Sequence, residues 1–229
     1  MLLALLVGVA IYFSEAKKQQ KLGENGFLIA FGAVAGGIVG AKVLQWALNY
    51  KFVLANFSNL SALLSGRTIV GGLLGGVLGS LLTKKILGVK EKRGNLFAPA
   101  VAAGMAIGRL GCFFQGCCFG KATGLLWGVD FGDHILRHPT QLYEALFMTG
   151  MFIFLEKIKD RADIKPGELF KILMVGYFVF RFLIEFIRVE PVVLWGFTSF
   201  QIISIGVIIY SVRDNLRTLI YNLKIYARR

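Results

Sequence analysis

The stretch GFLIAFGAVAGGIVGAKVLQWAL, residues 26–48, decides the class of fold. It contains a single charged side chain, that of Lys42. A helical crossing of a bilayer needs roughly 20 predominantly apolar residues. A helix also satisfies its backbone hydrogen bonds internally, as a hydrocarbon environment requires. The stretch therefore predicts a transmembrane helix.

Similar apolar runs recur along the whole chain. Of its residues, 56% are hydrophobic, which is more than a soluble domain of this length keeps dispersed in water. We therefore expect an all-α polytopic membrane protein that forms a single transmembrane domain over residues 1–229. About seven crossings are expected, at residues 1–15, 26–48, 68–88, 95–115, 141–156, 168–187 and 196–212.

The formal charge of +13 is compatible with a nucleic-acid partner, but the positions of the basic residues indicate a membrane topology instead. They cluster in alternate loops, which is the pattern of cytoplasmic loops in membrane proteins. With an odd number of crossings, this predicts an outer N-terminus and an inner C-terminus. The clusters are Lys17, Lys18 and Lys21; Lys84, Lys85, Lys90, Lys92 and Arg93; Lys157, Lys159, Arg161 and Lys165; and Arg213, Arg217, Lys224, Arg228 and Arg229.

Two segments on the predicted outer side are not expected to cross the membrane. Residues 51–66 are amphipathic and predict a helix that lies in the headgroup layer. Residues 115–140 are polar and rich in glycine, so they predict an outer loop or arm. Within the crossings, closely spaced glycines over residues 32–40 and 71–79 predict closely packed helices.

Charged side chains inside crossings are costly, so each is a candidate for function. Arg109, Arg181 and Glu185 qualify, and Lys42 is a weaker case. Tyr177, Arg181, Glu185 and Arg188 fall close to one helical stripe. One interpretation is an internal ion pair that locks two helices together. The other is a pocket whose arginines bind an anion such as a lipid phosphate, which the surplus of arginine favours.

All three cysteines lie in the run from Gly108 to Gly120, as Cys112, Cys117 and Cys118. Thiolate metal sites usually show a two-residue spacer and a second ligand pair, so no metal is expected here. A disulfide between Cys112 and either partner, or buried inert thiols, are the alternatives.

A histidine-containing segment, RHPTQLYE, occupies residues 137–144. His138, beside Gln141, Tyr143 and Glu144, is a candidate general base near neutral pH. Alternatively, Pro139 and Thr140 simply begin the fifth crossing.

Three motifs resemble bacterial prolipoprotein diacylglyceryl transferases. They are Gly108-Arg109-Leu110-Gly111 with Gly116 and Gly120, the segment Arg137–Glu144, and the helix Tyr177–Arg188. Their order agrees from about residue 30 to the last helix. The resemblance implies a seven-helix enzyme of the bacterial inner membrane. Such an enzyme moves diacylglycerol from phosphatidylglycerol to the cysteine thiol of a lipobox-containing preprolipoprotein, and releases glycerol phosphate.

The resemblance also implies roles for residues of this chain. Arg109 and Arg181 would hold the lipid phosphate, with Glu185 and Tyr177 orienting that site and Gly120 shaping the loop beside it. His138, Arg109, Arg181 and Glu185 are the expected catalytic residues. No metal or organic cofactor is implied.

The chain departs from the family pattern at several positions. Cys112, Gln115 and Cys117 stand where asparagines and a glutamate are usual, and Val70 stands where a histidine precedes Gly71-Gly72-Leu73. Ile38 replaces an arginine, with Lys42 one turn later. Two further hypotheses therefore remain open. One is a transferase with another acceptor that uses Cys112, Cys117 or Cys118 for thiol chemistry. The other is a lipid-binding membrane protein without catalytic activity.

Overall fold

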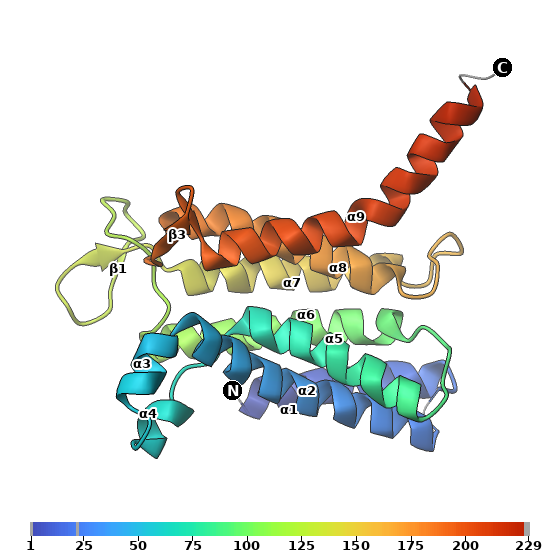
Figure 1. Cartoon of the computed structure of the whole chain (residues 1–229), viewed down its shortest axis with the longest axis horizontal. Helices are drawn as coiled ribbons and strands as arrows, with labels where there is room; N and C mark the ends of the chain where they lie inside the picture. The colour runs from blue at the N-terminus through green and yellow to red at the C-terminus, as the bar shows by residue number, and fades with distance from the viewer. Residues whose placement is uncertain (1, 22, 227–229) are drawn as a thin grey trace. The chain divides into compact units, whose positions relative to one another are not determined.

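The computed structural model describes residues 2–21 and 23–226, so Arg228 and Arg229 of the last basic cluster lie outside the described residues. The described chain is mostly helical (Figure 1). Its helices are α1 (Leu2–Lys18), α2 (Glu24–Leu48), α3 (Tyr50–Ala55), α4 (Leu60–Leu64), α5 (Ile69–Ile86), α6 (Gly94–Phe114), α7 (Thr140–Ile158), α8 (Glu168–Ile184), the 3-10 turn η1 (Glu185–Ile187) and α9 (Ser199–Tyr226). Each predicted crossing falls on one of the helices α1, α2 and α5 to α9.

Three segments of the described residues are long and apolar enough to cross a membrane by length and composition. They are Asn25–Leu48, Ile69–Ile86 and Gly94–Phe114. A shorter apolar helix covers Ser199–Arg213. The helical membrane class is thus confirmed, whereas the count of seven crossings stays a prediction.

Two short antiparallel hairpins interrupt the all-α pattern. Strands β1 (Val129–Asp130) and β2 (Leu136–Arg137) pair in the predicted outer arm, and β3 (Val192–Leu194) pairs with β4 (Phe197–Thr198) before α9. The expectation of an all-α chain omitted both hairpins because two- and three-residue strands are too short to show an alternating pattern.

The chain forms two compact units, and their two boundaries fall inside α1, after Ser14, and after Glu91. The unit Glu15–Glu91 is built on the pair α2 and α5. A methyl group added to Gly75 would meet the carbonyl oxygen of Gly36, and one added to Gly40 would lie 2.5 Å from the oxygen of Gly71. The predicted close packing of the two glycine-rich helices is therefore confirmed.

The predicted interfacial segment 51–66 is divided between α3 and α4. The break comes after Asn56, which ends α3 and whose side chain donates to the carbonyl of Phe52. Asparagine favours such helix ends because its side chain competes for backbone hydrogen bonds. Large apolar side chains along both helices are exposed, as a position in the headgroup layer requires; they are Tyr50, Phe52, Leu54, Phe57, Leu60 and Leu64.

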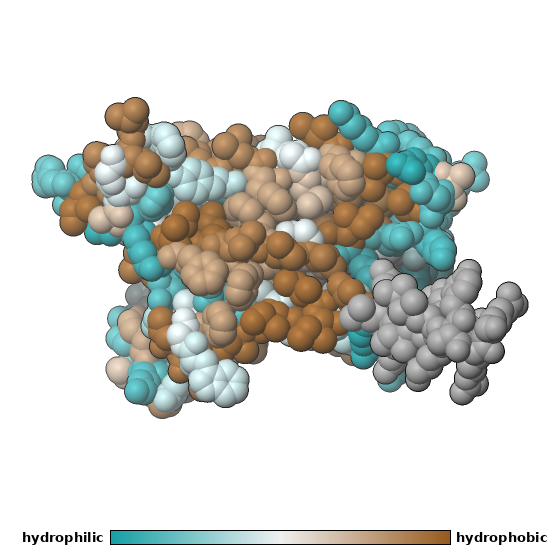
Figure 2. Space-filling view, turned by 90° about the horizontal axis from the view of Figure 1, so that it is seen from above, coloured by the Kyte–Doolittle hydropathy of each residue, from teal (hydrophilic) through white to brown (hydrophobic). Residues whose placement is uncertain are grey.

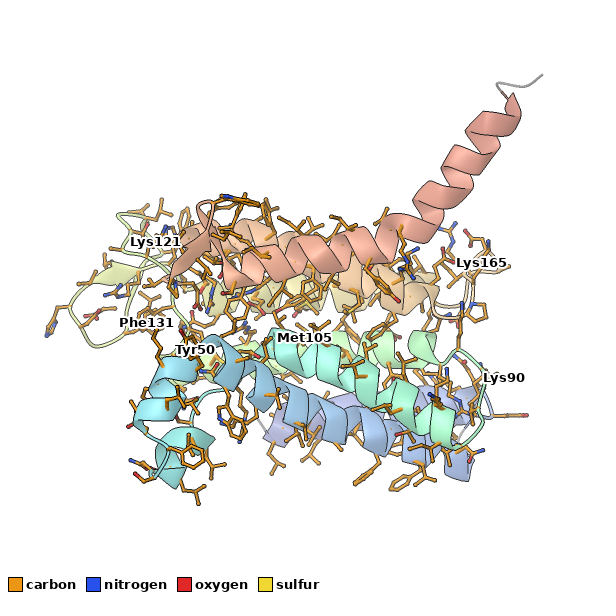
Figure 3. The ribbon with its side chains drawn as sticks, viewed as in Figure 1. Tyr50, Lys90, Met105, Lys121, Phe131 and Lys165 are labelled. Atoms are coloured by element: carbon orange, nitrogen blue, oxygen red, sulfur yellow. The ribbon has the colours of Figure 1, made fainter. Side chains whose placement is uncertain are left out.

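The second unit comprises residues 1–14 and 92–229. Helix α6 packs on α7 and α8, and α8 packs on α9. Gly8 of α1 lies against Ala100 and Gly104 of α6, and the ring of Tyr12 stacks on that of Phe97. In this unit, the arm that contains Lys121 and the loop that contains Lys165 lie at opposite ends of the helices (Figure 3).

One face of the molecule carries the surface expected of a membrane protein. Figure 2 shows hydrophobic side chains gathered over the middle of this face and hydrophilic side chains gathered toward its two ends. A band of apolar surface between polar ends is what a bilayer solvates. The core beneath is unusual, because it also holds charged side chains; these are Arg109, Glu144, Arg181, Glu185 and Arg188.

Candidate active site

The first part of the site is a buried ion pair between α6 and α7. The Nε atom of Arg109 lies 2.6 Å from Oε1 of Glu144, and the hydroxyl of Tyr177 donates to the same oxygen at 3.3 Å. Glu144 and Tyr177 are fully buried. A buried charge must be paired or hydrogen-bonded to be tolerated. Glu144 and Tyr177 therefore fix the guanidinium of Arg109 in place.

The second part lies at the end of α8. The Nη2 atom of Arg181 lies 2.9 Å from Oε2 of Glu185. An internal ion pair is one of the two interpretations that the sequence allows, and this one joins residues four apart at the end of α8. Thr198 donates its hydroxyl proton to Oε1 of Glu185 at 2.9 Å. The guanidinium of Arg181 also lies over the ring of Phe200, 4.7 Å from its centroid. These contacts hold Arg181 and Glu185 in one arrangement.

Arg188 completes the cluster of charged groups. Its Nη2 atom donates to Glu190 at 3.1 Å, and its Nε atom lies 3.7 Å from Glu185. Tyr177 is close enough to interact electrostatically with both Arg109 and Arg181. Arg188 is close enough to interact electrostatically with Arg109. The two ion pairs thus form one buried cluster, with Tyr177 between its arginines.

Several polar atoms of this cluster lack a partner. Nε of Arg109, Nε and Nη1 of Arg181 and Nε of Arg188 are buried donors without a hydrogen bond, and Oε2 of Glu144 and Oε2 of Glu185 are buried acceptors without one. Leaving such a donor unsatisfied costs about 1–3 kcal/mol, and more for a charged group. An anion that accepts from these nitrogens would remove that cost, and the tetrahedral oxygens of a phosphate suit guanidinium donors. The geometry thus fits the anion pocket predicted from the sequence.

Gly120 lies where three backbone segments meet. Its N–H donates to the carbonyl of His138 at 2.8 Å, and the N–H of the next residue, Lys121, donates to the carbonyl of Ile187 at 2.7 Å. A methyl group on Gly120 would lie 2.6 Å from the oxygen of Ile187 and 2.8 Å from Cβ of His138. Only glycine fits this crossing, which ties the arm to the end of α8. The structure thus supports a shaping role, and contact with phosphate stays a prediction.

The three cysteines come together at the end of α6. All three are free, and their Sγ atoms lie within 4.8 Å of one another. A hydrogen bond from the Cys112 thiol and the nearby guanidinium groups of Arg109 and Arg188 hold the pKa of Cys118 well below its ordinary value. Burial raises the pKa of Cys117 instead. Cys118 is therefore the thiol best suited to exist as a thiolate.

The family is decided by comparison with known proteins. Residues 1–213 match the family described as prolipoprotein diacylglyceryl transferase. The chain belongs to this family. Curated relatives named phosphatidylglycerol–prolipoprotein diacylglyceryl transferase include one from Clostridium tetani, 33% identical over 196 residues, covering 82% of this chain and 78% of the relative. A relative from Clostridioides difficile is 31% identical over 210 residues, covering 89% and 83%. One from Pasteurella multocida is 33% identical over 192 residues, covering 81% and 67%.

In this member of the transferase family, His138 lies in the arm. Its Nδ1 atom is 3.4 Å from the hydroxyl of Tyr143, which also accepts from Nε1 of Trp127 at 2.8 Å. The backbone of His138 pairs with that of Gly120 and Lys121. These contacts support a structural role in the arm, and the role of general base stays a prediction.

Two buried residues of the candidate site were not foreseen in their present roles. Glu144 was noted only as a neighbour of His138, yet it is the partner of Arg109. Gln141 is fully buried, and its amide donates to the carbonyl of Cys117. Helical spacing offered a signal for both, because polar residues three apart in the first turn of an apolar helix share one face.

Val70 and Ile38, two of the positions that depart from the family pattern, lie in the unit Glu15–Glu91, which holds α2 and α5. Val70 is buried in the first turn of α5, and Ile38 is exposed on α2. The Nζ atom of Lys42 donates to the carbonyls of Leu63, Ser65 and Gly66 at 2.8–3.0 Å. Lys42 therefore fixes the segment after α4, which is a structural role.

Proposed function

We propose that this transferase moves the diacylglyceryl group of phosphatidylglycerol to the cysteine thiol of a prolipoprotein. Membership of the family and the names of the relatives support this reaction. One observation links this reaction to the candidate site: two nitrogens of Arg181, Nε and Nη1, are buried without a hydrogen bond. Because these nitrogens are buried, they can donate hydrogen bonds to a phosphate group without competition from water.

In this proposal, each residue of the site has its own role in the reaction. Arg109 and Arg181 bind the phosphate of the lipid, and Tyr177 and Glu185 orient the two guanidinium groups. Gly120 shapes the arm beside them. His138 takes the proton of the acceptor thiol, because a thiol of ordinary pKa is mostly protonated at neutral pH and only the thiolate is a good nucleophile.

The reaction needs no redox partner. The acceptor sulfur forms a bond to the glycerol carbon that carries the phosphate, and the bond from that carbon to the phosphate oxygen breaks. The oxygen keeps the electron pair and leaves as glycerol phosphate. The arginines stabilise the charge that develops on this leaving group.

We further propose that the enzyme lies in the bacterial inner membrane with about seven crossings, its N-terminus outside and its C-terminus in the cytoplasm. The alternate basic loops support this orientation. It places the arm and the end of α8 on the outer side. The charged cluster then lies toward the side of the membrane on which the prolipoprotein emerges.

The direct test uses the full chain in liposomes with a synthetic lipobox peptide. With phosphatidylglycerol present, we expect the peptide to gain the mass of a diacylglyceryl group and glycerol phosphate to appear in equal amount. Liposomes of phosphatidylethanolamine alone, and a peptide whose cysteine is replaced by serine, are the controls. Unmodified peptide in the presence of phosphatidylglycerol would reject the proposal.

The role of His138 has its own test. A His138→Gln variant should lose turnover and still bind phosphatidylglycerol, because glutamine keeps hydrogen bonding and lacks the base. His134→Gln is the control, since the side chain of His134 is 98% exposed in the same arm. If His138→Gln turns over at the wild-type rate, His138 only positions the arm.

A second candidate function is favoured by the convergence of the three thiols. In this reading, the chain transfers the same lipid group to another acceptor. Replacing the peptide with small thiols or amines in the liposome experiment distinguishes the two readings, because the product mass identifies the acceptor.

A further inference from the structure

The cluster of Cys112, Cys117 and Cys118 has no part in the phosphate pocket. Its geometry comes from the end of α6. The N–H groups of Gly116 and Cys117 donate to the carbonyls of Phe113 and Cys112, and Gly116 has a φ of +65°. This is the Schellman arrangement that ends many helices. It turns the chain back, so that Cys117 and Cys118 return to Cys112.

Buried polar side chains hold this turn in place. The carbonyl of Cys117 accepts from the amide of Gln141. The carbonyl of Cys118 accepts from the hydroxyl of Thr140 at 2.7 Å and from Nη1 of Arg188 at 3.0 Å. Thr140 and Gln141 are fully buried. Groups that fix the backbone of a ligand-bearing loop are the support that metal sites require around their ligands.

The three sulfurs are also spaced for a shared ion. Tetrahedral bonds of about 2.3 Å from Zn²⁺ to sulfur place neighbouring sulfurs about 3.8 Å apart. The Sγ atoms already lie within 4.8 Å of one another, so small rotations of the side chains would close the site. Among the described residues, no histidine or carboxylate joins this group. Three thiolates select a soft cation rather than Mg²⁺ or Ca²⁺.

The residues around the three thiols match the charge of such a metal site, and the exposure of the thiols leaves the metal accessible. Nη1 of Arg188 donates to the carbonyl of Cys118 at 3.0 Å, and this positive charge beside the turn offsets part of the negative charge of three thiolates on a divalent ion. Cys112 is buried, Cys117 is half-buried and Cys118 is exposed. A metal held by all three would thus have one side open.

We propose that Cys112, Cys117 and Cys118 bind one Zn²⁺ ion and leave its fourth position open for the thiol of the acceptor. The first part departs from the sequence argument against a metal. That argument considered spacing along the chain, whereas the turn at Gly116 brings the thiols together in space. The second part rests on the proposed function, since it assigns the metal to the acceptor of that reaction.

The metal would serve the reaction by producing a thiolate. Coordination would lower the pKa of the acceptor thiol, so that its proton passes to His138, the base of the proposed function, because a metal-bound thiol is deprotonated. The bound sulfur then attacks the glycerol carbon as its bond to the phosphate oxygen breaks, and glycerol phosphate leaves with the electron pair. Zn²⁺ is neither oxidised nor reduced. Three protein ligands with an open fourth position are the usual arrangement of catalytic zinc.

The binding test uses Co²⁺ as a spectroscopic substitute for Zn²⁺. The full chain in detergent is stripped with a chelator under reducing conditions and titrated with Co²⁺. We expect about one ion per chain, with a thiolate-to-cobalt absorption that Zn²⁺ abolishes. Each of the variants Cys112→Ser, Cys117→Ser and Cys118→Ser should bind at least about tenfold more weakly. His134→Gln, which removes an exposed imidazole, should bind as the wild type does.

Binding of phosphatidylglycerol by each serine variant shows that it is folded, so a loss of metal is not a loss of structure. Co²⁺ that binds without thiolate absorption, or equally well to a folded triple serine variant, would overturn the metal site. Failure of Zn²⁺ to displace the bound Co²⁺ would overturn the identity of the metal, because thiolate sites bind Zn²⁺ more tightly than Co²⁺.

The acceptor test adds the lipobox peptide to the cobalt-substituted protein. We expect its cysteine to change the cobalt spectrum, and the serine peptide to leave that spectrum unchanged. If metal-free protein and the triple serine variant both form thioether at the wild-type rate, the catalytic role of the metal fails and the proposed function stands. If cobalt binds through the thiols but no preparation forms thioether, the proposed function fails and the metal site stands.

Discussion

Glu144 of α7 holds Arg109 of α6 by a contact of 2.6 Å between Oε1 and Nε, and both side chains are buried. The sequence suggested two arginines and one glutamate in the pocket, and hence a surplus of positive charge. The carboxylate of Glu144 removes that surplus. Each of the three arginines has a carboxylate beside it, as Arg109–Glu144, Arg181–Glu185 and Arg188–Glu190. Affinity for an anion then depends on unpartnered N–H groups more than on net charge.

Glu144→Ala should destabilise the protein, because it leaves the guanidinium of Arg109 buried without its carboxylate. Breaking a buried ion pair in this way costs about 3–5 kcal/mol. Unfolding in detergent, followed by the exposure of tryptophan, measures the change. Glu156→Ala is a matched control on the same helix, since Glu156 pairs with Lys159 near the surface and such pairs contribute about 0–1 kcal/mol. Equal losses in the two variants would contradict a special role for the buried pair.

Arg181→Ala should weaken the binding of phosphatidylglycerol roughly tenfold or more, since charge-assisted hydrogen bonds contribute about 1.5–3 kcal/mol each. Arg181→Lys should restore little of this affinity, because lysine cannot donate from two fixed positions. Native mass spectrometry of the protein with titrated lipid gives the affinities. Arg161→Ala removes an exposed arginine paired with Asp163 and should bind lipid normally. Wild-type affinity in Arg181→Ala would place the lipid elsewhere.

Gly120→Ala should disturb the arm, because its methyl group would lie 2.6 Å from the carbonyl oxygen of Ile187. Overpacking of this kind costs typically about 1–3 kcal/mol. Limited proteolysis between Lys121 and Arg137 reports the opening of the arm. Gly124→Ala is the control in the same arm, since an added methyl group there would meet nothing within 4 Å. Faster cleavage in the control than in Gly120→Ala would refute the prediction.

Gly75→Ala should separate α2 from α5, because the new methyl group would meet backbone atoms of Gly36 and Gly40. The expected loss is about 1–3 kcal/mol in the free energy of unfolding. Gly72→Ala tests the same helix, but there the nearest atoms would lie 3.7 Å away, which is an ordinary contact. Comparison of thermal unfolding of the two variants decides the matter, and equal stability would argue against close helix contact.

The orientation of the chain is tested by single added cysteines at Lys90 and at Gly132. An impermeant maleimide that adds a large mass is applied to intact cells, with the wild type as the baseline for the native thiols. We expect extra labelling at position 132, in the arm, and none at position 90, in a basic loop. The reverse result would invert the proposed topology.

The sequence predicted the helices well because hydrocarbon imposes a long, continuous apolar pattern on each crossing. The pair Arg181–Glu185 was one of the two interpretations that the sequence allowed, since residues four apart on one helix can meet. The sequence did not predict the contact of Arg109 with Glu144, which joins two helices through a tertiary arrangement that no local spacing encodes. The meeting of the three cysteines was missed for a similar reason, since it depends on the left-handed turn at Gly116.

The two ends of the arm are joined by backbone hydrogen bonds, and this affects how far the sequence between them can change. Hydrogen bonds from Gly120 to His138, from His138 to Lys121 and from Thr123 to Leu136 fasten the two ends of the arm together. The cost of closing a loop rises by only about 0.6 kcal/mol for each doubling of its length. Residues 124–135 can therefore be lengthened or exchanged with little strain on the charged cluster. An affinity tag or a folded reporter inserted after Gly132, where a side chain would meet open space, should be carried by an otherwise native protein.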